Sequence, residues 1–144
     1  MALIRASFVS VRFTMTSYTG GAHGAHWTEV HNLLTTPLRS LSIEELFEDP
    51  TAGLKSISDF AITELLKSGA PDSVRDERWV REGAGPDPKN FRAFNLTSRG
   101  VLVTFDEYQV ASYAEGVSEV HVPYDVVAGR LHPPLAAKVM DRDL

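Results

Sequence analysis

Three histidines lie close together in the sequence and could supply imidazole ligands to a metal ion. They are His23, His26 and His31, and three protein ligands plus a water are what a catalytic zinc ion uses. On an extended strand, however, His26 and His31 are separated by an odd number of residues, so their side chains leave opposite faces. His23, in a turn, could still join either of them. We therefore keep a small metal-dependent hydrolase as the alternative function.

Two carboxylates near a tyrosine offer a second possible chemistry. Glu115 and Glu119 flank the region of Tyr113, and glycoside hydrolysis needs two carboxyl groups roughly 5 to 10 Å apart. With 19 Asp and Glu in the chain, such pairs arise readily by chance. The sequence also has no nucleophile elbow, Walker loop or dinucleotide fingerprint. We therefore predict that the protein is not an enzyme and has no cofactor.

The tyrosines after residue 105 are the stronger candidates for function. Tyrosine offers a large contact area at low entropic cost and is enriched at binding hot spots. Tyr108 closely follows apolar strand residues, which predicts that it is the more buried, whereas Tyr113 lies between small residues and is expected to be exposed. We expect at least one tyrosine of the set, which includes Tyr124, to pack in the core. The predicted partner-binding residues come from this loop and from a Gly-rich turn: Tyr18, His23, Tyr108, Tyr113 and Glu115.

The elements that must position these residues begin with a hairpin. Residues 9–16 alternate apolar and polar side chains one by one, the pattern of a strand with one face buried. Residues 17–24 contain three glycines and predict a turn. Residues 26–34 are rich in aromatic and β-branched types and predict the returning strand.

The main helix is predicted from its start and stop signals. Asp49 and Pro50 supply an N-cap and a proline at the first helical position, and apolar residues then recur on one face up to Gly69 and Pro71. Just before it, Ser42 and Glu45 have the spacing of a capping box.

The rest of the chain predicts a broken helix, a loop and three more strands. Residues 73–89 are charged and then rich in Gly and Pro, with Trp79 as an expected anchor. Residues 91–97 and 101–105 predict a second hairpin, and residues 119–122 a short final strand. The predicted class is α+β: an antiparallel sheet built from two hairpins plus the short final strand, with one main helix packed on one face. No definite structure is predicted after residue 129.

Length and composition limit the class of protein. The 144 residues predict one domain, 1–144, with a core at about 8–127. The 14 Lys and Arg against 19 Asp and Glu give a net charge of −5, which argues against nucleic acid as a partner. The chain has no cysteine, which excludes disulfides and thiolate metal sites. No apolar run approaches the roughly 18 residues of a membrane span, and we expect any export signal to lie outside this chain.

Two segments together resemble the RsiV-like domain family. They are residues 17–24, with the sequence SYTGGAHG, and residues 94–124, which run from FNLT through GVLVTFDEYQVASYAEG to EVHVPY. The resemblance spans about residues 8–127, and Ser112 replaces a proline common in the family. The family occurs in bacterial envelope proteins, including a lysozyme-sensing anti-sigma factor and a membrane-anchored peptidoglycan deacetylase.

The resemblance implies an α+β domain that lacks catalytic residues of its own and lies in the periplasm or at the cell surface. The leading prediction is a non-enzymatic binding or sensing module of the bacterial cell envelope. Its expected partner is a lysozyme-like protein or a peptidoglycan fragment, contacted by the tyrosine loop and the Gly-rich turn.

Overall fold

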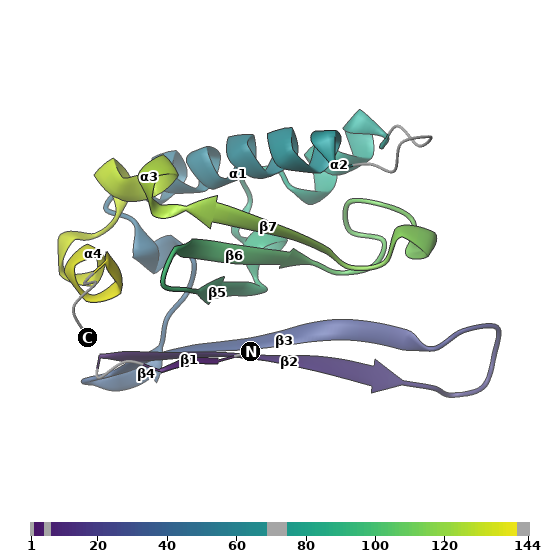
Figure 1. The fold of residues 1–144 in the computed structure, drawn as a ribbon, viewed down its shortest axis with the longest axis horizontal. Helices are drawn as coiled ribbons and strands as arrows, with labels where there is room; N and C mark the ends of the chain where they lie inside the picture. Colours follow the sequence, from purple (N-terminus) through teal and green to yellow (C-terminus); the bar gives the residue numbers. More distant parts are fainter. Residues whose placement is uncertain (1, 5–6, 69–74, 141–144) are drawn as a thin grey trace.

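The computed structural model describes residues 2–4, 7–68 and 75–140. The elements form three layers, which Figure 1 shows from the side. Helix α1 (Pro50–Lys67) covers one face of a three-stranded sheet, and the other face of that sheet lies on a four-stranded sheet. The predicted α+β class is therefore confirmed.

The four-stranded sheet contains the first predicted hairpin. Its order is β1 (Ala2–Ile4), β2 (Phe8–Ser17), β3 (Ala25–Thr35) and β4 (Leu38–Ser40), and every neighbouring pair is antiparallel. Strands β2 and β3 form the hairpin predicted from alternation. The short strands β1 and β4 were not predicted.

The three-stranded sheet contains the second hairpin and the final strand. It consists of β5 (Phe94–Leu96), β6 (Gly100–Phe105) and β7 (Ser118–Pro123), in that order. Alternate residues form a buried apolar face that packs against α1, whose own buried residues include Leu54 and Ile57. The strand residues of that face are Phe94, Leu96, Val101, Val103, Phe105, Val120 and Val122.

The two predicted hairpins thus lie in two stacked sheets instead of one. A buried polar network connects them. Ser10 Oγ on β2 donates to Asn32 Oδ1 at 2.6 Å and accepts bonds from Asn95 Nδ2 at 2.9 Å and the Leu96 N–H at 3.1 Å. Asn32 Nδ2 in turn donates to the Phe94 carbonyl at 2.8 Å. Hydrogen bonds of this kind require the sheets to meet face to face in one register.

Only the first part of one face of β2 is buried, and it is the face that carries the polar residues of the alternation. Ser10 is only 1% exposed, because it faces the three-stranded sheet. On the opposite, apolar face Phe13 is 50% and Met15 36% exposed. Alternation therefore identified the strand but not which of its faces is covered.

The helix signals were mostly correct. Asp49 Oδ1 accepts from the Ala52 N–H at 3.1 Å as the N-cap of α1, whereas the predicted stop at Gly69 and Pro71 lies outside the described residues. Glu45 reaches back to the Ser42 N–H at 2.8 Å, which is one half of the capping box.

The remaining helices are η1 (Glu44–Leu46), α2 (Glu77–Gly83), η2 (Pro88–Phe91), η3 (Tyr113–Glu115), α3 (Tyr124–Val127), η4 (Ala128–Arg130) and α4 (Pro133–Met140). None of the helices in the described ranges is both long and apolar enough to cross a bilayer.

The segment after residue 129, for which no structure was predicted, includes helix α4. Leu131 and Leu135 are buried and belong to the hydrophobic core. The core therefore extends beyond residue 127, because these two side chains cover the end of the molecule at which β4 and η1 lie.

His121 on β7 makes stability depend on pH. Its Nε2 lies 3.1 Å from Thr97 Oγ1, and burial, followed by the charge of Arg99, lowers the pKa of the imidazole. Because the folded pKa is below the unfolded value of about 6.5, the folded state binds fewer protons in acid. This contribution to stability is complete above pH about 6.5 and is lost as the pH falls below it. We expect the His121→Gln variant to lose less stability than the wild type between neutral pH and pH about 5, measured by urea unfolding.

Candidate functional site

Three of the five predicted binding residues meet in an aromatic cluster, which we define as His23, Tyr108 and Tyr113. The His23 and Tyr113 rings stack with centroids 4.1 Å apart, and the Tyr108 and Tyr113 rings lie 5.8 Å apart. The Tyr113 hydroxyl also donates to the Gly24 carbonyl at 3.3 Å. The Gly-rich turn between β2 and β3 is therefore packed against the tyrosine loop, residues 106–117.

Tyr108 is the exposed tyrosine of the cluster, which contradicts the expectation that it is the more buried. Its side chain is 55% exposed, whereas Tyr113 is half-buried under His23. The reason is the turn closed by the bond from the Gln109 N–H to the Asp106 carbonyl at 3.0 Å. It places Tyr108 at the third turn position with φ +66°, from which its side chain projects outward.

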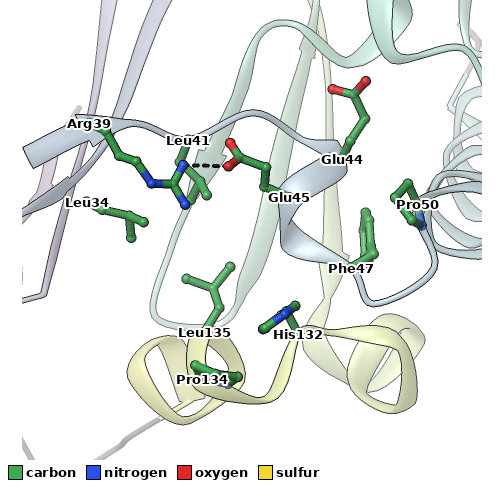
Figure 2. A pocket seen from close by; sticks show the side chains of 10 residues that line it. All are labelled: Leu34, Arg39, Leu41, Glu44, Glu45, Phe47, Pro50, His132, Pro134 and Leu135. Atoms are coloured by element: carbon green, nitrogen blue, oxygen red, sulfur yellow. Dashed lines mark hydrogen bonds and ion pairs between the residues drawn. The ribbon is translucent and has the colours of Figure 1, made fainter. Parts of the chain in front are cut away.

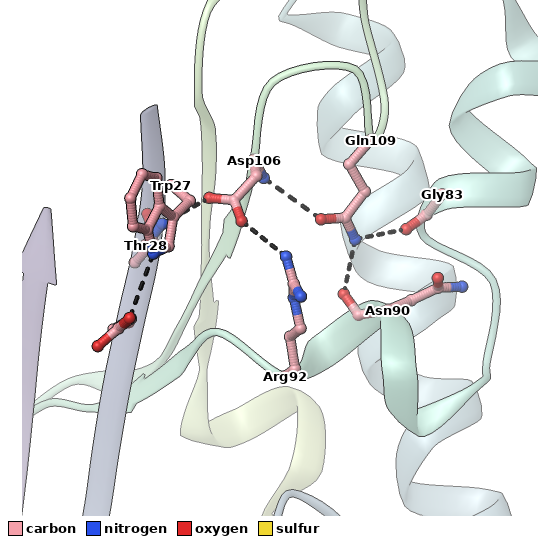
Figure 3. Close-up of polar contacts among 8 residues, drawn as sticks. Trp27, Thr28, Gly83, Asn90, Arg92, Asp106 and Gln109 are labelled. Carbon is pink, nitrogen blue, oxygen red and sulfur yellow. Dashed lines mark hydrogen bonds and ion pairs between the residues drawn. The ribbon is translucent and has the colours of Figure 1, made fainter. Parts of the chain in front are cut away.

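The backbone of Tyr108 is held in this conformation from several sides. A positive φ is uncommon for a bulky residue and persists only where its surroundings enforce it. The Trp79 indole N–H donates to the Tyr108 carbonyl at 3.0 Å. Gln109 Nε2 donates to the Gly83 carbonyl at 3.0 Å and the Asn90 carbonyl at 2.9 Å (Figure 3). The tyrosine loop is thus held by hydrogen bonds directly beside the exposed Tyr108 ring.

Asp106 connects the tyrosine loop to strand β3 and to Arg92, the residue that follows η2. Its Oδ1 accepts from the Thr28 N–H on β3 at 3.0 Å, and its Oδ2 accepts from Arg92 Nη2 at 2.9 Å, as Figure 3 shows. The Asp106 N–H donates to Gln109 Oε1 at 3.3 Å. Sequence reasoning missed this set, since Thr28 and Asp106 are 78 positions apart and no local pattern pairs them.

The other two predicted residues, Tyr18 and Glu115, lie outside the cluster. Tyr18 is 69% exposed, and its hydroxyl donates to the Gly21 carbonyl at 3.1 Å within its own turn. Glu115 accepts from Arg75 Nε at 3.0 Å, and the Arg75 side chain is only 8% exposed. Glu115 therefore holds the end of the loop in place. A contact of either residue with a partner stays a prediction.

The remaining tyrosine and carboxylate have structural partners. Tyr124 is buried, and its hydroxyl donates to the Thr97 carbonyl at 2.8 Å, so at least this tyrosine packs in the core, as expected. Glu119 forms an ion pair with Arg12 on β2. Glu115 and Glu119 thus each face an arginine, and this geometry does not favour the acid and base of a glycosidase.

The three histidines do not converge. His26 Nδ1 lies 3.2 Å from Glu107 Oε1, whereas His31 packs edge-on against Phe13 on the opposite face of the sheet, with ring centroids 6.0 Å apart. His23 stacks on Tyr113. As predicted from their odd spacing, the His26 and His31 side chains leave opposite faces of the strand. Within the residues that the structure describes, no three His, Cys, Asp or Glu side chains are grouped as metal ligands.

An open hollow of about 630 Å³ adjoins the aromatic cluster. Tyr108 lines it together with residues of η2 and the residue that follows η2. Charged and amide side chains of both donor and acceptor type contribute to the lining. The lining residues are Lys89, Asn90, Arg92, Asp106, Glu107, Tyr108 and Gln109.

A second cavity, of about 420 Å³, lies at the other end of the molecule among β3, β4, η1 and α4. Its walls are mainly apolar, with Leu34, Phe47 and Leu135 among them, and the Arg39–Glu45 ion pair lies along one side (Figure 2). None of the predicted binding residues lines this cavity.

Comparison with known families gives one match over the middle of the chain. The family described as "Protein of unknown function (DUF3298)" matches residues 44–125. Among curated proteins, the peptidoglycan-N-acetylmuramic acid deacetylase PdaC of Bacillus subtilis (strain 168) is 32% identical over 104 residues, which are 72% of this chain and 22% of that protein.

Solved structures share the fold. A DUF3298 family member from Bacteroides fragilis superposes with a TM-score of 0.72 at 24% identity, over 97% of this chain and 55% of that one. A DUF3298 family protein from Pseudomonas aeruginosa PAO1 gives a TM-score of 0.61 at 18% identity, over 93% of this chain and 61% of that one. The chain therefore spans little more than half of these structures and a smaller part of the curated relative.

Proposed function

The chain belongs to the DUF3298 family, the RsiV-like family that the two sequence segments resemble, and on this premise we propose that it is a non-enzymatic binding module of the bacterial cell envelope that recognises cell-wall glycan. The related deacetylase PdaC acts, by its name, on the N-acetylmuramic acid of peptidoglycan. The matched part is 22% of that protein. A module that accompanies an enzyme of this kind supports an extracytoplasmic location and a cell-wall ligand.

The observation that carries the proposal is the aromatic cluster. Tyr108 presents more than half of its surface to solvent on a backbone held at positive φ, and Tyr113 and His23 support it from behind. Ordered, exposed aromatic side chains on loops mark binding surfaces. The adjoining hollow supplies amide, carboxylate and cationic groups that can bind hydroxyl and acetamido groups of a sugar.

The exposed and supporting tyrosines should differ in a predictable way. We expect Tyr108→Ala to change the free energy of unfolding by less than about 1 kcal/mol, because the side chain is largely exposed. Tyr113→Ala should cost about 1 to 2 kcal/mol, because it removes the stack on His23 and the bond to Gly24. This order is the reverse of the one predicted from sequence. Both variants should weaken binding of soluble muropeptides by about 2 kcal/mol, roughly 30-fold in Kd, measured by calorimetric titration.

The control is Tyr18→Ala, since Tyr18 is exposed and lies outside the cluster. It should leave the affinity for muropeptides within about threefold of the wild type. Parallel titration with lysozyme tests the other predicted partner. Binding to lysozyme without binding to muropeptides would mean that the ligand of this module is a protein and not a glycan. Binding to neither would overturn the proposal.

The non-enzymatic part has its own test. Muropeptides incubated with the protein should be recovered unchanged by mass spectrometry, with and without added divalent metal. Loss of an acetyl group or cleavage of a glycosidic bond, if abolished by a substitution in the cluster, would contradict it.

A further inference from the structure

Part of the edge of strand β3 is not covered by another strand. Strand β4 pairs only with residues 33–35 of β3. In an antiparallel sheet the N–H and C=O of one residue point to the same side, and successive residues alternate. The Thr35 N–H bonds to the Ser7 carbonyl, on the β2 side, whereas the Asn32 carbonyl accepts from the Leu41 N–H, on the β4 side. Even-numbered residues of β3 therefore point their backbone groups toward the β4 side.

The even-numbered residues 28, 30 and 32 differ in their hydrogen bonds. The Thr28 N–H is bonded to Asp106 Oδ1, and the Asn32 carbonyl to Leu41. In the part of the chain that the structure describes, the Asn32 N–H and both the N–H and the C=O of Val30 have no partner. The donor and acceptor pair of Val30 is thus open to a ligand, whereas Asn32 is buried and has Leu41 opposite it.

A groove lies beside these open groups. After Leu41 the chain leaves the edge of β3, because η1 turns it toward α1. The lining of the resulting space of about 260 Å³ includes Val30 and Asn32 of β3 together with Pro88, Arg92 and Phe94. Arg92 also lines the hollow next to Tyr108, so the two depressions are neighbours.

We propose that this edge of β3 binds an extended polypeptide segment of a partner protein by strand addition. A polypeptide in β conformation carries an N–H and a C=O on the same side of every second residue, which matches the open N–H and C=O of Val30. The residue opposite Val30 exchanges two hydrogen bonds with it in an antiparallel pairing. Asp106 at Thr28 and Leu41 at Asn32 close the two ends, so about three residues of the segment pair with β3.

Charge favours a basic side chain on that segment. Glu44 lines the groove, is half-buried and makes no ion pair within the described ranges. In Figure 2 its carboxylate points away from the cavity drawn there. A lysine of the bound segment would give this carboxylate a partner, which is worth more in a partly buried site than on the open surface. The binding depends on backbone groups outside the aromatic cluster and is independent of the proposed glycan recognition.

Amide hydrogen exchange followed by NMR tests the open edge directly in the full chain. The Val30 amide should exchange much faster than those of Glu29 and His31, whose backbone groups face β2. Equal protection of Val30 and His31 would overturn the proposal, because the edge would then not be open.

The probe for binding is an acetylated and amidated peptide of alternating Thr and Val with one central Lys. At millimolar concentration it should slow exchange of the Val30 amide at least about tenfold and shift resonances of Val30, Asn32 and Glu44. N-methylation of one alternate set of its residues should abolish binding, and N-methylation of the other set should not, because only one set faces β3. No binding of the unmodified peptide, or equal binding of both methylated forms, would overturn strand addition.

Two substitutions separate the backbone and charge contributions. Val30→Pro removes the open N–H of Val30 and breaks no bond to β2, and a proline is tolerated at an edge position. This substitution should weaken the affinity for the peptide at least about tenfold relative to Val30→Thr. Glu44→Gln should weaken the Lys peptide severalfold but not its Gln counterpart, whereas Glu48→Gln, outside the groove, should change neither. If Val30→Pro does not fold, the N-methylated peptides decide the question on the wild type.

Discussion

Replacing Ser10 by alanine is expected to lower the free energy of unfolding by about 3 kcal/mol. One hydroxyl makes three buried hydrogen bonds, to Asn32, Asn95 and the backbone N–H of Leu96. The variant leaves three buried polar groups without this partner, and each unsatisfied group costs about 1 to 3 kcal/mol before relaxation. Because the network joins the two sheets, the loss should affect the whole fold and not a local segment.

Urea unfolding followed by circular dichroism measures this change as a shift of the midpoint at constant slope. Thr14→Ala is the matched control, since Thr14 has the same parity on β2 but is exposed, and it should cost less than about 0.5 kcal/mol. If both variants lose the same stability, the polar network does not hold the sheets together as we describe.

Gly83→Ala should destabilise the protein by a similar amount, about 3 kcal/mol, and release the tyrosine loop. A Cβ at residue 83 would lie 1.9 Å from the carbonyl oxygen of Gln109, a backbone atom that cannot rotate away. The loop must therefore move, which breaks the bond from Gln109 Nε2 to the Gly83 carbonyl and disturbs the neighbouring Tyr108. Affinity for any ligand of the aromatic cluster should fall together with stability.

Gly129→Ala provides the comparison, because a Cβ there would meet nothing within 4 Å. It should leave stability within about 0.5 kcal/mol of the wild type. NMR spectra of the two variants show where the change is: in Gly83→Ala the largest shifts should fall on Gln109, Tyr108 and Tyr113. A stable Gly83→Ala protein with an unshifted tyrosine loop would refute the close approach of α2 and this loop.

The candidate site was predictable in its residue types but not in its geometry. Tyrosine enrichment at interfaces identified Tyr108 and Tyr113, and both lie in the cluster with His23. Their relative exposure was predicted the wrong way round, because Tyr108 occupies the third position of a turn, from which its side chain projects outward. Nothing local to the sequence of the loop indicates that Gln109 and Trp79 hold this turn in place.

The sequence by itself determined the elements that depend on neighbours along the chain. The alternation of β2, the cap of α1 at Asp49 and the opposite faces of His26 and His31 all follow from strand and helix periodicity or from bonds over three residues. The RsiV-like segments likewise identified the family. Each of these features needs no knowledge of what packs against the element.

Only the tertiary structure decided which surfaces are covered. Period-two alternation gives a strand two different faces, but burial of a face depends on what the rest of the chain brings to it. Ser10, on the polar face of β2, is buried because Asn95, 85 residues away, supplies a group that bonds its hydroxyl. The open edge of β3 likewise exists only because the chain departs after Leu41. Such long-range pairings depend on many weak contacts at once, and no local sequence pattern specifies them.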